Sequence, residues 1–190
     1  MASSGFPPQS LKPLLAEVTT LLSSRNELVA VAETAAGGIL SSSLLSTPGA
    51  SKIYAGGLTL YTLEARVAFG GWTQENIANY AGPTSDIVKG LARHVRGQLS
   101  KATYAIAESG TAGPSAGGPR GQDGEDVKRR KTPGYVVLAV DCADGRCFSR
   151  EVETGLGGDR AANMVRFAEE GLRLLRDVIK GDIEGDELFP

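Results

Sequence analysis

Two short segments of the sequence each combine a glutamate, a hydroxyl residue and a run of small residues. Residues 32–38 read Ala-Glu-Thr-Ala-Ala-Gly-Gly, and residues 107–113 read Ala-Glu-Ser-Gly-Thr-Ala-Gly. A hydroxyl beside a carboxylate suits nucleophilic or acid–base chemistry. Small residues and glycines leave backbone N–H groups free to bind an anion, or the oxyanion of a reacting carbonyl. We therefore place a candidate site between the two segments.

The residues of these segments have distinct candidate roles. Thr34 is the candidate nucleophile, and the backbone N–H groups after it are candidate oxyanion donors. Glu33 and Glu108 offer alternative acid–base chemistry, because two carboxylates that end neighbouring strands perturb each other. A structural interpretation, in which each glutamate hydrogen-bonds a loop, stays open. The remaining candidates are small or hydroxyl-bearing residues that would bind substrate: Gly37, Gly38, Ser109, Gly110, Thr111, Ala112 and Gly113.

Both segments follow apolar runs typical of buried strands. Residues 28–32 are rich in β-branched and small apolar residues, and an apolar helical pattern begins at Ile39. The pattern predicts a strand, a tight turn and a helix, with Thr34 at the carboxyl end of the strand. Residues 103–108 predict a second buried strand. Ligands of open α/β sheets bind at this edge, which agrees with the position of the candidate site.

The rest of the chain predicts helices that alternate with strands. Residues 54–61 predict a strand, and residues 134–140 and 147–154 predict a hairpin around the turn signal Asp144-Gly145. Helices are predicted over residues 11–22, 63–69, 73–80, 83–99 and 159–178. This order predicts an α/β fold, a single-domain three-layer α/β/α sandwich with a mixed sheet and helices on both faces.

Three segments are predicted to lie outside this core. Residues 1–9 form a flexible leader and residues 181–190 an acidic tail, which leaves a domain over residues 10–180. Residues 115–133 are glycine-rich and charged, and they are too long for a neat turn, so we expect a mobile loop. Its basic run, residues 128–131, indicates a solvated loop, with a nuclear signal or a contact to a nucleotide phosphate as alternatives.

Composition narrows the class of function. The formal net charge is −2, which does not favour a nucleic-acid or membrane partner, and no apolar run reaches the ~20 residues that cross a bilayer. Residues 1–8 lack the features of a signal peptide, so we expect a cytoplasmic protein with Cys142 and Cys147 reduced. His94 is the single histidine, and no GxGxxG motif follows the first strand. We therefore expect neither a metal nor a cofactor.

Several of these segments together resemble one family, the C-terminal domain of the competence- and damage-inducible CinA proteins, known as nicotinamide-nucleotide amidohydrolase. The family's Ala-Glu-Ser-Cys-Thr-Gly-Gly resembles residues 32–38, its Tyr-Ser-Asn-Glu-Ala-Lys resembles residues 61–66, and its Gly-Ile-Ala-Gly-Pro resembles residues 110–114. Four further motifs are similar in the same order: Pro-Gly-Ser-Ser at residues 48–51, Gly-Ala-Val-Ser-Glu-Pro-Val at 82–88, Lys-Pro-x-Gly at 131–134 and Gly-Asp-Arg at 158–160. The resemblance covers about residues 10–180.

The resemblance implies the fold of that domain and a specific reaction. The reaction is hydrolysis of the carboxamide of nicotinamide mononucleotide to nicotinate mononucleotide and ammonia, by a protein that is commonly a homo-oligomer. Thr34 stands at the position of the presumed nucleophilic serine. Tyr61 would orient the substrate or shuttle a proton, and Arg66 would anchor it electrostatically. Ser85 and Arg160 lie in matching motifs and are further candidates for substrate binding.

Two departures from the family's motifs bear on the chemistry. Thr34 keeps a hydroxyl but adds a methyl group that restricts χ1 and crowds attack. Arg66 replaces a lysine, and an arginine does not give up its proton to act as a base. Three functions therefore stay open. They are an amidohydrolase acting through Thr34, a catalytically impaired nucleotide-binding homologue, and a different hydrolase or transferase centred on Ser109 and Glu108.

Overall fold

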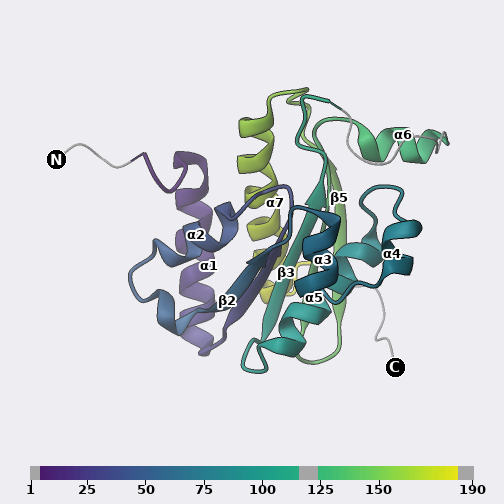
Figure 1. Cartoon of the computed structure of the whole chain (residues 1–190). Helices are drawn as coiled ribbons and strands as arrows, with labels where there is room; N and C mark the ends of the chain where they lie inside the picture. Colours follow the sequence, from purple (N-terminus) through teal and green to yellow (C-terminus); the bar gives the residue numbers. More distant parts are fainter. Residues whose placement is uncertain (1–4, 116–123, 184–190) are drawn as a thin grey trace.

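The structure is a computed structural model that describes residues 5–115 and 124–183. A five-stranded sheet lies at its centre (Figure 1). The strand order is β2-β1-β3-β4-β5. The strands are β1 (Val29–Glu33), β2 (Tyr54–Thr59), β3 (Tyr104–Gly110), β4 (Tyr135–Cys142) and β5 (Cys147–Glu153). The first three run parallel, whereas β4 and β5 are each antiparallel to the preceding strand in this order. The predicted mixed sheet and the predicted hairpin are thus confirmed.

Helices cover both faces of the sheet (Figure 1). One face carries α1 (Lys12–Arg25), α2 (Ile39–Leu45) and α7 (Arg160–Lys180). The other face carries α5 (Ser85–Gln98), with α3 (Leu63–Phe69) and α4 (Gln74–Ala78) beside it. Two short 3₁₀ turns, η1 (Gln9–Leu11) and η2 (Ala50–Lys52), complete these layers. The arrangement is the three-layer α/β/α sandwich that the sequence predicts.

The central strands are buried on both faces, as expected for strands between two helical layers. Alternate residues of β1 belong to two separate cores. Val29 and Val31 pack toward α1, α2 and α7, whereas Ala30 and Ala32 pack toward α5. This alternation follows from the two-residue period of a strand, so the side chain of Glu33 continues on the face of α2.

The connections of β1 create a switch point in the sheet. After β1 the chain passes through α2 to β2 on one side of β1, and β3 then pairs with β1 on its other side. The segments that follow β1 and β3 therefore leave the sheet next to each other. Open α/β sheets bind ligands at such a point, beyond the carboxyl ends of the strands.

The long segment after β3 differs in part from the expected loop. Glu125–Lys131 forms a short helix, α6, instead of irregular chain. Glu125 and Asp126 lie in its first turn and four basic residues in its last turn, which is the charge order that stabilises a helix dipole. The predicted mobility of the segment rests mainly on residues 116–123, which lie outside the described residues, as do residues 1–4 of the leader and 184–190 of the tail.

Three further expectations concern the cysteines, metals and membranes. Cys142 and Cys147 are free thiols and both are buried. Across residues 5–115 and 124–183, no group of three or more His, Cys, Asp and Glu side chains is arranged to hold a metal ion. Within the same ranges, no helix has the length and apolar character that a bilayer crossing requires.

Candidate functional site

The two Glu-hydroxyl segments lie side by side, as the sequence predicts. Val29–Ala32 pairs in parallel with Tyr104–Ala107, so both strands end at the same edge. The Glu108 side chain reaches across to the turn after β1, where its Oε1 accepts hydrogen bonds from Thr34 N at 2.5 Å and Ala36 N at 2.8 Å. A carboxylate of β3 therefore holds the turn that carries the candidate nucleophile.

Glu33 is committed to a structural role. Its side chain is fully buried, and its two carboxylate oxygens accept four hydrogen bonds of 2.6–2.9 Å from the start of α2. The donors are Gly38 N, Leu40 N, and the N and Oγ of Ser41. The chain's own carboxylate thus occupies the helix end that the sequence analysis assigned to a ligand anion. The structural interpretation holds for this residue.

Glu108 keeps one oxygen without a hydrogen bond. The side chain is fully buried, and Oε2 has no hydrogen-bond partner among the described residues. Burial raises the pKa of Glu108 to about 7, and the nearby Glu33 adds to the increase, whereas the two backbone N–H groups and Arg66 oppose it. A carboxyl group with a pKa near 7 is able to accept and return a proton at neutral pH.

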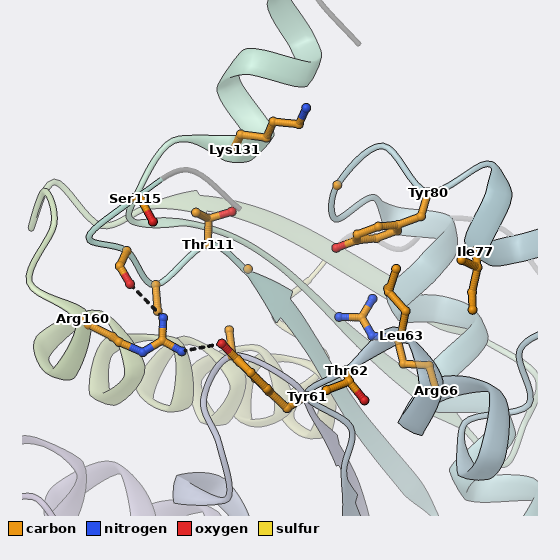
Figure 2. A pocket seen from close by; sticks show the side chains of 15 residues that line it. Tyr61, Thr62, Leu63, Arg66, Ile77, Tyr80, Thr111, Ser115, Lys131 and Arg160 are labelled. Carbon is orange, nitrogen blue, oxygen red and sulfur yellow. Dashed lines mark hydrogen bonds between the residues drawn. The ribbon is translucent and has the colours of Figure 1, made fainter. Parts of the chain in front are cut away.

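A cavity of about 540 Å³ opens at this edge of the sheet (Figure 2). Residues at or just beyond the carboxyl ends of all three parallel strands line it, namely Ala35 after β1, Tyr61 and Thr62 after β2, and residues 110–113, which begin with the last residue of β3. Three cationic side chains also line it: Arg66, Lys131 and Arg160. None of the described residues that line the cavity is acidic, so the cavity favours an anionic ligand.

Arg66 is the buried cation of the cavity. It comes from α3, whose N-terminus is capped by the Thr62 side chain, and it is only 5% exposed. Its guanidinium carbon lies 4.9 Å from the centre of the Trp72 ring and 5.2 Å from that of Tyr80. Nη2 donates to Ser109 Oγ at 3.4 Å, whereas Nε and Nη1 are buried and have no hydrogen-bond partner in the part of the chain that the structure describes.

Arg160 lies on the opposite side of the cavity (Figure 2). It is the first residue of α7, and it is exposed. Nη1 donates to Gly113 O at 2.8 Å, and Nη2 donates to Tyr61 Oη at 3.3 Å, so that one guanidinium joins the segments after β2 and β3. Tyr61 itself is 65% exposed and faces this arginine from the cavity rim.

Some predicted site residues lie behind the cavity wall. Thr34 is 3% exposed and is not part of the cavity lining. Its neighbour Ala35 is the residue of the turn after β1 that lines the cavity. Gly37 and Gly38 shape the turn through left-handed φ angles of 68° and 97°. Ser85 begins α5 after the cap Thr84 and does not contribute to the lining.

The segment after β3 contributes its backbone and small side chains to the lining. Gly110, Ala112 and Gly113 all line the cavity, as does Thr111, whose hydroxyl donates to Arg130 O at 2.8 Å. A side chain at Gly110 would lie 2.7 Å from Tyr135 O, so only glycine fits between β3 and β4 there. Ser109 is buried and contacts Arg66 instead of opening into the cavity.

Sequence reasoning missed the aromatic environment of Arg66, and it gave a phosphate contact for the basic run of residues 128–131 only as an alternative. Trp72 and Tyr80 lie in short segments without a chemical motif, and no local signal pairs them with an arginine on another helix. Lys131 belongs to this basic run and lies in the cavity wall. Its position favours the alternative in which the run contacts a phosphate. Ile77 and Leu63 add apolar lining.

Together these features define a class of protein. It is a three-layer α/β/α domain with a cavity at the switch point of a mixed sheet, lined by three cations and, among the described residues, by no acidic side chain. The sequence model of the CinA C-terminal domain matches residues 11–179 of this chain. The chain therefore belongs to the CinA C-terminal domain family.

Relatives of known name agree with this family. A CinA-like protein of Acidobacterium capsulatum is 32% identical over 155 residues, which cover 82% of this chain and 34% of that protein. A CinA-like protein of Chlorobaculum tepidum is 31% identical over 156 residues, covering 82% and 35%. This chain thus spans about a third of the length of the curated relatives it matches.

Solved structures agree with the fold. The competence/damage inducible protein CihA from Agrobacterium tumefaciens superposes with a TM-score of 0.76 at 22% identity, covering 91% of this chain and 97% of that one. A CinA superfamily protein from Escherichia coli gives a TM-score of 0.72 at 21% identity, covering 87% and 89%. These similarities confirm the predicted α/β architecture.

Proposed function

We propose that this chain hydrolyses the carboxamide of nicotinamide mononucleotide, releasing ammonia and nicotinate mononucleotide. The observation that supports the proposal most is the cavity, which joins three cations to the segment that follows Thr34 and has no acidic lining among the described residues. Arg160 and Lys131 suit the phosphate, while Tyr61 and Tyr80 offer aromatic surfaces to the pyridine ring. Family membership is consistent with this substrate class.

The proposed reaction uses Thr34 as the nucleophile. Its Oγ attacks the carboxamide carbon, the C–N bond breaks, ammonia leaves, and water then hydrolyses the resulting ester. Arg66 retains its proton, so another group must accept the threonine proton. Glu108 is the best candidate, because its carboxylate already contacts the backbone N–H of Thr34 and its pKa is about 7.

Ammonia release provides the direct test of this function. The wild type is assayed with nicotinamide mononucleotide, with nicotinamide and with amino-acid amides. We expect ammonia from the mononucleotide in preference to the others, and loss of that activity in Thr34→Ala without loss of the fold by circular dichroism. Unchanged turnover in Thr34→Ala would contradict the mechanism and favour the Ser109 alternative.

A second candidate function is nucleotide binding without turnover. The observation that favours it is Arg66, which stands where the family's motif has a lysine. Its guanidinium, packed against Trp72 and Tyr80, supplies charge but no base. In that case calorimetry would detect mononucleotide binding while the ammonia assay stays at background. The homo-oligomer and the cytoplasmic location that the sequence analysis predicts stay predictions, and light scattering of the purified chain tests the first.

A further inference from the structure

The arginine at the base of the cavity has more hydrogen-bond donors than the protein satisfies. Arg66 is only 5% exposed, yet its Nε and Nη1 have no hydrogen-bond partner among residues 5–115 and 124–183, and the contact from Nη2 to Ser109 Oγ is long at 3.4 Å. A buried N–H group without an acceptor is costly, and one on a charged group more so. The structure records no ion pair between Arg66 and a carboxylate of the described residues. The guanidinium therefore lacks an acceptor that a ligand would provide.

Glu108, whose carboxyl group interacts electrostatically with Arg66, does not provide this acceptor. Its Oε1 is held by Thr34 N and Ala36 N, and its Oε2 makes no hydrogen bond to the arginine or to any other described residue. The aromatic rings of Trp72 and Tyr80 stabilise the cation through their faces, and Nε and Nη1 keep no hydrogen-bond acceptor among the described residues. Nη2 forms a two-donor edge with either of these nitrogens, and its own contact to Ser109 Oγ is long at 3.4 Å, so a planar oxyanion at Nη2 and one neighbouring nitrogen would accept two parallel hydrogen bonds.

We propose that Arg66 forms a carboxylate subsite, and that this chain binds pyridine mononucleotides with a ring carboxylate more tightly than those with a carboxamide. The choice of a nucleotide rests on the proposed function, whereas the subsite rests on Arg66 itself. A carboxylate offers two acceptors to the guanidinium and carries a full negative charge, whereas a carboxamide is neutral and turns one N–H₂ group toward the same donors.

The separation of Arg66 from Arg160 explains why we assign the carboxylate, and not the phosphate, to Arg66. Arg66 is buried, and Leu63 and Tyr80 lie next to it in the cavity wall (Figure 2). Arg160 is exposed and lies at the other side of the cavity. A phosphate is strongly hydrated and suits the exposed side of the cavity, where Arg160 lies. A planar carboxylate on an aromatic ring suits the buried arginine beside Trp72 and Tyr80.

The experiment compares nicotinate mononucleotide with nicotinamide mononucleotide by calorimetry. Both are titrated into the full chain carrying Thr34→Ala, so that the amide stays intact, and ammonia is monitored throughout. We expect the acid to bind about tenfold or more tightly than the amide, the range set by hydrogen bonds to charged groups. Arg66→Gln should abolish this preference by weakening the acid, and Arg66→Lys should retain only part of it.

A matched control removes a different arginine. Arg146→Gln changes the same charge at the β4–β5 turn, on the opposite edge of the sheet, and should leave the preference unchanged. Equal or tighter binding of the amide in the Thr34→Ala parent, or a preference that persists in Arg66→Gln, would overturn the proposal.

A second pair of probes separates the subsite from the nucleotide. Trp72 is the single tryptophan of the chain and lies against Arg66, so its fluorescence reports ligands at the guanidinium. Benzoate should change the Trp72 signal at lower concentrations than benzamide does, and Arg66→Gln should remove the difference. Absence of a benzoate response, together with no binding of either mononucleotide, would refute the subsite. Hydrolysis can fail in the ammonia assay while the acid preference persists, which would refute only the proposed function.

Discussion

Glu108 Oε1 accepts a hydrogen bond from the backbone N–H of Thr34 at 2.5 Å. The bond joins strand β3 to the turn that follows the neighbouring parallel strand, β1. This contact ties the candidate nucleophile to a buried carboxyl group whose second oxygen has no partner in the described part of the chain. The position of the turn after β1 and the charge next to it therefore both depend on the side chain of Glu108.

The first prediction concerns the pH dependence of stability. Burial raises the pKa of Glu108 from 4.5 to about 7, so the folded chain binds this proton more tightly than the unfolded chain. The contribution is fully present below pH 4.5 and is lost as the pH rises through 7. It amounts to about 3 kcal/mol, since one pKa unit equals about 1.4 kcal/mol.

Urea unfolding between pH 4.5 and 8 provides the measurement for this effect. The difference in free energy of unfolding between wild type and Glu108→Gln should fall as the pH rises, because glutamine does not titrate. The neighbours Glu33 and Arg66 are common to both proteins, so the difference isolates Glu108. Parallel curves over this range would show that the carboxyl titrates near its ordinary pKa.

The second prediction concerns the structural role of Glu33. Glu33→Ala should lower the free energy of unfolding by about 2–4 kcal/mol, because it leaves one buried and two partly buried N–H groups at the start of α2 without their acceptor. Glu75→Ala, at an exposed position in the first turn of α4, is the control and should change stability by less than about 1 kcal/mol. Equal effects of the two substitutions, seen by thermal unfolding, would contradict this assignment.

The third prediction concerns the catalytic groups. Thr34→Ser should keep or raise the rate of ammonia release, because serine retains the hydroxyl without the methyl group. Arg66→Lys should raise the rate further if proton acceptance by Glu108 limits it, because lysine adds a second base, by up to about 10²–10⁴-fold, the usual contribution of a general base. The double variant should be fastest. Steady-state rates that do not rise in any of the three variants would indicate that neither position limits turnover.

The fourth prediction concerns the exposed cations. A mononucleotide should raise the Tm of the wild type in proportion to the logarithm of its concentration above Kd. Arg160→Ala should reduce this shift, since it removes both the cation and the link between Gly113 and Tyr61. Arg93→Ala, on α5 and beside Asp141, serves as a control that lies away from the cavity wall. No shift in the wild type at millimolar ligand would exclude the nucleotide interpretation.

Much of the scaffold is predictable because its signals are local. The β-branched run before Glu33 and the apolar spacing after Gly38 specify a strand and a helix without reference to other segments. The α6 helix was missed, since a charged seven-residue segment in glycine-rich surroundings resembles a loop until its charges are compared with a helix dipole.

The sequence by itself determined the α/β sandwich, the family and the sheet edge at which Thr34 and residues 110–113 meet. Only the tertiary structure decided how the charged residues are used. Glu33 and Glu108 follow the same local pattern, yet Glu33 accepts four hydrogen bonds from the start of α2, while Glu108 Oε2 is buried without a partner in the described part of the chain. Likewise, Arg66 lies against Trp72 and Tyr80, and two of its buried nitrogens have no acceptor among the described residues. Burial and partners depend on segments distant in the chain, so no local pattern of residues encodes them.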